Sequence, residues 1–128
     1  MNREQALKVV MVLVGLLFVA GIYPILMSLW HWSPSDDPGD MMMLSLYVTL
    51  GILLLLAVRN PAANRSLIAF AAWSSFAHGA VMSIIAIHDA GDRTGFLIGS
   101  GVLALIGVTL IALAPAKSVQ LRASPVGE

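Results

Sequence analysis

Long apolar stretches separated by short polar connectors dominate the pattern of the chain. Four stretches without Asp, Glu, Lys or Arg occupy residues 9–30, 41–58, 67–87 and 96–114. Crossing about 30 Å of hydrocarbon takes about 20 mostly apolar residues in a helix. A segment in lipid must satisfy its own backbone groups, so these stretches are predicted to be helices. The pattern therefore predicts an all-α integral membrane protein with four spans.

The connectors between the spans are short and rich in turn-forming residues. They read HWSPSDDPGD, RNPAANRS and HDAGDRTG, in which Pro, Gly, Asn, Asp and Ser indicate turns. Short connections place successive helices side by side, which predicts an antiparallel four-helix bundle. The whole chain, residues 1–128, is expected to form a single transmembrane domain, with a short mobile tail at residues 116–128.

Basic and acidic residues are distributed unequally between the two sides of the predicted spans. Six of the seven basic residues fall on the side that carries the two termini and the second connector, whereas Arg93 and five aspartates fall on the other side. By the positive-inside rule, both termini are predicted to be cytoplasmic. This pattern is typical of a multi-pass protein of the bacterial inner membrane. A cleaved signal peptide is the alternative for the first stretch, but its apolar run is too long and no A-x-A site follows.

Composition excludes several classes of protein. Hydrophobic residues make up 59% of the chain and charged residues 11%, and the net charge is zero. A soluble domain usually carries about 25% charged residues, and a neutral chain has no electrostatic basis for binding nucleic acid. Cysteine is absent, which excludes dithiol chemistry and thiolate metal sites. The partners expected are the lipid bilayer and either another membrane protein or a second copy.

His78 is the ionisable residue that the spans contain, near the middle of the third. No span holds a carboxylate, so proton-coupled exporters and ion pumps that need one are excluded. The imidazole is expected to be neutral, since desolvation disfavours its charged form. It can hold helices together by a hydrogen bond or bind a ligand, whereas a bis-histidine haem would need a second buried imidazole. Its candidate partners, all polar and at similar depth, are Tyr23, Tyr47, Thr49, Ser74 and Ser75.

The outer connectors combine imidazoles and carboxylates. His31 ends the first span, and His88 lies beside Asp89 and Asp92. Such groups can bind Zn²⁺ or Mn²⁺, so a metal site at the outer face is one hypothesis. The alternative is that these aspartates form turns and cap helices, with Asp40 as the expected cap of the second span.

Small residues predict where helices pack closely. They recur every four positions in the third span at Ala71, Ser75, Gly79 and Ser83, and Gly95 and Gly99 form a similar pair at the start of the fourth. Pro24 removes a backbone hydrogen bond close to Gly21 and predicts a kink in the first span.

The opening helix carries a family resemblance. The segment GLLFVAG at residues 15–21 resembles the first helix of the small four-pass bacterial proteins grouped around the DoxX-like families. That resemblance implies an up-and-down four-helix bundle, sometimes an accessory partner of membrane oxidoreductases, and it transfers no catalytic residue to this chain.

These observations predict a small membrane protein that acts without catalysis, as an accessory or structural subunit or as a lipid-binding protein. No catalytic residue is identified, and no cofactor is expected. The main alternative is a quinone-like or lipid-like ligand beside the Pro24 kink, bonded by His78, Tyr23 and Tyr47. The second alternative is the metal site of the outer face.

Overall fold

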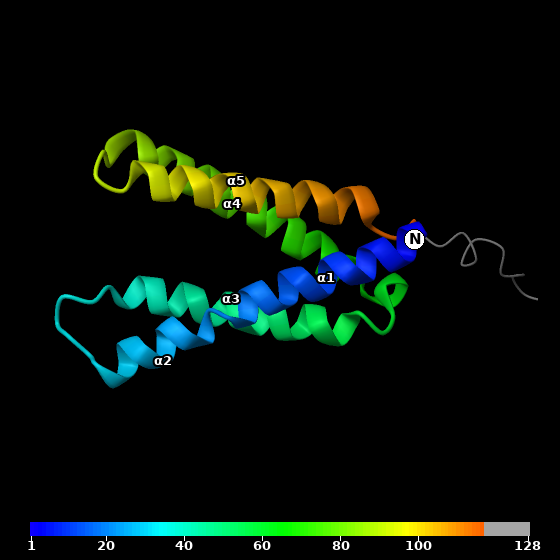
Figure 1. Cartoon of the computed structure of the whole chain (residues 1–128), viewed down its shortest axis with the longest axis horizontal. Coiled ribbons are helices and arrows are strands. Elements are labelled where there is room, and N and C mark those ends of the chain that lie inside the picture. Colours follow the sequence, from blue (N-terminus) through cyan, green and yellow to red (C-terminus); the bar gives the residue numbers. More distant parts are fainter. Residues whose placement is uncertain (117–128) are drawn as a thin grey trace, which may run out of the picture.

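The computed structural model describes residues 1–116, and this part of the chain is built from helices without strands (Figure 1). Its elements are α1 (Arg3–Val19), α2 (Ile22–Trp30), α3 (Pro38–Ala57), the 3₁₀ turn η1 (Pro61–Asn64), α4 (Arg65–His88) and α5 (Arg93–Leu113). They make four segments long and apolar enough to cross a membrane. The prediction of an all-α chain with four apolar spans is confirmed. The tail predicted to be mobile lies, apart from its first residue, outside the described residues.

Helix α1 begins six residues before the predicted start of the first span. Asn2 caps it, because its side-chain oxygen accepts a hydrogen bond from the Gln5 backbone N–H at 2.8 Å. The Gln5 side chain in turn accepts from the Asn2 N–H at 3.2 Å, which completes a capping box. Glu4 and Lys8 form an ion pair one turn apart, at 3.3 Å. The first two turns are therefore helical but polar, and hydropathy alone could not assign them.

The predicted kink in the first span is present, one turn before Pro24. Proline has no N–H and its ring displaces the carbonyl four residues earlier, which here belongs to Ala20. That carbonyl accepts from the Tyr23 N–H at 3.2 Å instead, and the Gly21 N–H donates to the Phe18 carbonyl at 3.1 Å. The break separates α1 from α2, and no residue of α2 is buried.

Two glycines allow α1 and α3 to pack closely. A Cβ atom added at Gly51 would lie 2.8 Å from the Gly15 carbonyl oxygen and 2.8 Å from the Phe18 Cβ. A Cβ added at Gly15 would lie 2.8 Å from the Leu55 side chain. Close backbone approach at small residues is the usual basis of helix packing in membranes. The sequence alone does not single out this pair, because the two glycines lie in different spans.

The second close seam joins α4 and α5. The Ser83 and Ser100 hydroxyls each donate to the Gly79 carbonyl oxygen at 2.9 Å and lie 3.0 Å from one another. Further along, a Cβ at Gly107 would lie 2.7 Å from the Phe76 ring. Gly79 and Ser83, which belong to the small-residue row predicted in the third span, thus face α5.

Of the glycine pair predicted in the fourth span, Gly99 contacts α4 and Gly95 does not. A Cβ at Gly95 would meet nothing within 4 Å, and one at Gly99 would meet the flexible end of Met82. The start of α5 lies at the exposed end of its hairpin, so the spacing of small residues has no partner backbone there. Helix α5 instead approaches α4 through Ser100 and Gly107.

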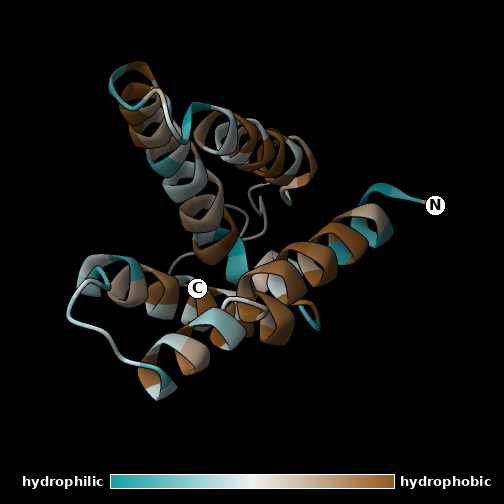
Figure 2. Ribbon diagram, turned by 60° about the vertical axis from the view of Figure 1, so that its left-hand side comes forward, coloured by the Kyte–Doolittle hydropathy of each residue, from teal (hydrophilic) through white to brown (hydrophobic). Residues whose placement is uncertain are grey.

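The two hairpins, α1–α2 with α3 and α4 with α5, meet at one end and diverge toward the other (Figure 1). Figure 2 shows the same spread, with the hydrophilic residues gathered at the helix ends and connectors. The four spans therefore do not share one core along their whole length. The shared core comprises Leu7, Met11, Val14, Phe18, Leu50, Leu54, Ala57, Ile68, Ala71, Ala72, Ile106 and Leu110.

Two arginines hold the joined end together. Arg3 of α1 donates to the Ala114 carbonyl at 2.8 Å, and Arg65 of α4 donates to the Pro115 carbonyl at 2.8 Å. Both carbonyls follow the C-terminus of α5, where a helix attracts positive charge. These bonds connect the beginning, middle and end of the described chain at one point.

Candidate ligand-binding cleft between the hairpins

The divergence of the hairpins leaves a cavity of about 480 Å³ between α3 and the α4–α5 hairpin. Its size lies in the range of small-molecule sites, about 300–1,000 Å³. Its wall is mostly apolar, with His78 and Asp40 as the titratable groups. The lining residues are Asp40, Met43, Ala77, His78, Val81, Met82, Ile85 and Phe96.

A row of three rings from three helices ends at His78, which lines this cleft. The Phe18 and Tyr47 ring centroids are 4.9 Å apart with an angle of 82° between the rings. The Tyr47 and His78 centroids are 5.3 Å apart at 88°. Edge-to-face contacts of this kind are favourable for aromatic rings. Tyr47 therefore connects the first hairpin to the second, and His78 presents its ring at the cavity.

The register of the helices gives the cleft a direction. Met43 precedes Tyr47 by one helical turn and Met82 follows His78 by one turn, and residues four apart share a face of a helix. Because α3 and α4 run in opposite directions (Figure 1), both methionines lie on the same side of the Tyr47–His78 pair. The cleft thus extends from His78, near the middle of α4, to Asp40 in the first turn of α3.

The structure brings Tyr47 to His78 but not the other predicted partners. Thr49 donates its hydroxyl to the Ser45 carbonyl at 3.0 Å, and Ser74 and Ser75 both donate to the Ala71 carbonyl. Tyr23 lies on α2 and is 68% exposed. Among residues 1–116, His78 forms no hydrogen bond, and its side chain is part of the cavity lining.

The predicted outer metal ligands are not brought together. Within the described residues, no three side chains of His, Cys, Asp or Glu lie close enough to hold a metal ion. His31 and His88 belong to different hairpins at their divergent end (Figure 1). Asp89 instead accepts from the Gly91 N–H at 2.9 Å, which makes it a turn former.

The cap of α3 also differs from the predicted one. Asp37 is the N-cap, and its carboxylate accepts from the Gly39 N–H at 2.8 Å. Asp40 lies in the first turn, which leaves its side chain free of a capping role and places it at the mouth of the cleft.

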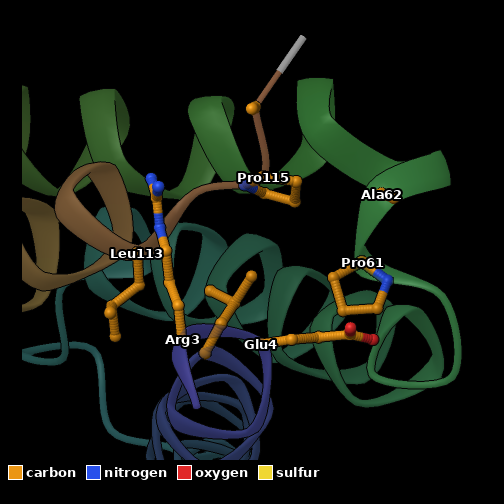
Figure 3. Close-up of a pocket in the computed structure, with 8 residues that line it drawn as sticks. Arg3, Glu4, Pro61, Ala62, Leu113 and Pro115 are labelled. Carbon is orange, nitrogen blue, oxygen red and sulfur yellow. The ribbon is translucent and has the colours of Figure 1, made fainter. Parts of the chain in front are cut away.

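A smaller pocket of about 280 Å³ lies at the joined end (Figure 3). Arg3, Glu4, Pro61 and Pro115 are among its lining residues. Arg3 donates to the Ala112 and Ala114 carbonyls at the C-terminal end of α5, and Glu4 pairs with Lys8 within α1. Because both polar groups already have partners and Arg3 joins α1 to α5, the pocket belongs to the junction of the hairpins. The wider cleft at His78 is the better candidate for a ligand.

The sequence matches the model of one protein family. Residues 3–127 match the profile of a family of unknown function, DUF6632. No curated protein matches the chain, and neither does any solved structure. Nothing in these comparisons confirms the resemblance to the DoxX-like families, so the cleft has to be interpreted from its own residues.

Proposed function

The chain belongs to DUF6632, a family of unknown function, and from its geometry we propose that it binds a lipid-like amphiphile, without catalysis, in the cleft between the hairpins. The observation that carries the proposal is the cavity of about 480 Å³ with His78 at its inner end. Aliphatic and thioether side chains line its walls, as an alkyl chain requires. The imidazole can donate or accept one hydrogen bond at each ring nitrogen, which suits a hydroxyl or carbonyl group of the ligand.

The proposal includes the orientation and the setting of the chain. The joined end carries Arg3, Lys8, Arg59 and Arg65, so we place it at the cytoplasmic face, in agreement with the positive-inside rule. The helices would then cross the membrane antiparallel, with both termini inside and the cleft open toward the outer leaflet. A bacterial inner membrane and an accessory role beside another membrane protein complete the proposal.

Blocking the cleft tests whether a ligand occupies it. Val81 lines the cavity and is 56% exposed, whereas Ile84 on the same helix is 58% exposed and does not line it. We expect Val81→Trp to lower the amount of co-purified lipid-like ligand at least about tenfold, since losing about 1.4 kcal/mol of binding has that effect. Native mass spectrometry of protein extracted in lipid discs measures the retained ligand. Ile84→Trp should retain as much as the wild type, and equal retention in both variants would overturn the proposal.

Replacing His78 tests the polar contact. His78→Leu removes a hydrogen bond worth about 0.5–1.5 kcal/mol, so we expect ligand affinity to fall about two- to tenfold. His88→Leu is the matched control, because His88 is exposed and lies outside the cavity lining. His78→Gln keeps a donor and an acceptor and should restore part of the affinity. Unchanged ligand content and partner binding in His78→Leu would exclude His78 as a ligand contact, including the contact required by a quinone-like head.

A further inference from the structure

We propose that the cleft selects amphiphiles with a positively charged head, an ammonium group in particular, held by Asp40 and Phe96 at its outer mouth. This inference rests on the proposed function and names the class of its ligand.

Asp40 is the charged side chain in the lining of the cleft. It lies in the first turn of α3, and its side chain neither caps the helix nor forms an ion pair in the part of the chain that the structure describes, where Glu4 and Lys8 make the ion pair. The carboxylate is therefore available to a ligand. An ammonium group is its natural complement, because opposite charges attract.

Phe96 lines the same cavity from the first turn of α5. The face of an aromatic ring attracts cations, and quaternary ammonium groups are recognised in this way in many proteins. The lining thus offers a carboxylate and an aromatic ring at the end of the cleft that opens toward the connectors. Tyr47 follows Asp40 by seven positions, a rise of about 10 Å along the helix. The head would therefore lie at Asp40, the chain along the apolar wall, and a hydroxyl or carbonyl group further along the ligand at His78.

The charged residues around the mouth of the cleft also favour a positively charged ligand. Four further aspartates lie in the two outer connectors, and the basic residue there, Arg93, is already engaged. Its Nε donates to the Ala86 carbonyl at 2.8 Å and its terminal nitrogen to the Ile87 carbonyl at 3.3 Å. Arg93 therefore stays at the C-terminus of α4 and is held away from an anionic head. A surface of one sign raises the local concentration of the opposite ion. The four aspartates are Asp36, Asp37, Asp89 and Asp92.

The test compares amphiphiles that share one alkyl chain. Protein in lipid discs is incubated with hexadecyltrimethylammonium, hexadecanol or hexadecanoate, and native mass spectrometry measures the bound fraction of each. We expect the ammonium compound to bind at least about tenfold more tightly than hexadecanoate, with hexadecanol between them. Asp40→Asn should remove most of this preference. Asp92→Asn removes the same charge from the outer end at a residue that does not line the cleft, and it should keep the preference.

The outcomes separate this inference from the proposed function. If all three compounds bind equally and Val81→Trp blocks all of them, the cleft binds amphiphiles but the selection by charge is wrong. If the preference persists in Asp40→Asn, or if Asp92→Asn removes it as completely, Asp40 is not the recognising group. If Val81→Trp blocks none of the three, the proposed function itself is wrong.

Discussion

Gly51→Ala is expected to lower the free energy of unfolding by about 1–3 kcal/mol, the usual cost of adding atoms to a well-packed contact. The new Cβ would lie 2.8 Å from the Gly15 carbonyl oxygen and 2.8 Å from the Phe18 Cβ. Both obstacles belong to the helix α1 and neither is the end of a flexible side chain, so α1 and α3 must move apart. Equilibrium unfolding of the purified protein in mixed micelles measures the change.

Gly101→Ala is the matched control for this substitution. Gly101 lies in α5, where an added Cβ would meet nothing within 4 Å. Alanine is favoured over glycine in a helix by about 1 kcal/mol, so this variant should be as stable as the wild type or slightly more stable. Equal destabilisation by both substitutions would show that the Gly15–Gly51 contact does not hold the first hairpin together.

Tyr47→Ala is expected to loosen the connection between the hairpins and to lower the free energy of unfolding by about 1–3 kcal/mol. The ring of Tyr47 makes edge-to-face contacts with both Phe18 and His78, and each such pair contributes about 0.5–1.5 kcal/mol. Without it, the two hairpins lose the contact that joins them at the inner end of the cleft. We therefore expect a broader range of distances between the hairpins, as well as lower stability.

Spin labels can measure that range directly, because the sequence contains no cysteine that would be labelled in addition. Ser35→Cys in the first outer connector and Thr94→Cys in the first turn of α5 place one exposed label on each hairpin. Tyr23→Ala removes the same side chain from an exposed position on α2 and should leave the distance distribution unchanged. A distribution that stays equally narrow in Tyr47→Ala would contradict the role assigned to the ring.

The positions of the spans could be predicted from the sequence, because their length and hydropathy are properties of contiguous residues. The kink could be predicted for the same reason, since Pro24 and Gly21 act on the backbone of their own helix. The first turns of α1 were missed, because Asn2, Glu4, Gln5 and Lys8 are polar and their helix depends on a capping box. Local sequence features therefore predict the individual helices but not how these helices pack.

The sequence did not show which faces of the helices contact one another. A helix that faces lipid is apolar on most of its surface, so its hydrophobic pattern does not show which side meets a neighbour. Gly15 and Gly51 are isolated glycines in different spans, and only their contact reveals the seam. Gly95 and Gly99 have the recognised spacing, but only Gly99 has a neighbour, the side chain of Met82, so spacing alone does not identify a seam.

The residues of the candidate site could likewise be predicted only in part from the sequence. His78 stood out because a titratable residue is rare inside a span, and Tyr47 followed from its similar depth. Asp40 and Phe96 were not identified as residues of the cleft, because the cleft arises from the divergence of two hairpins. That divergence is a property of the tertiary structure. The sequence signal that could have drawn attention to Asp40 is its place in the first turn of a spanning helix, directly after the acidic connector.

The break between α1 and α2 has a consequence for how the protein fits bilayers of different thickness. The apolar stretch of the first span covers residues 9–30, against residues 41–58 in the span of its partner α3, a difference of four residues or about 6 Å if both were straight. A straight helix would relieve such hydrophobic mismatch by tilting as a whole, which would disturb the Gly15–Gly51 contact. The break at Ala20 and Gly21 instead lets α2, which has no buried residue, tilt independently. The α2 part of the first span can therefore follow the local thickness of a bilayer while α1 stays packed against α3.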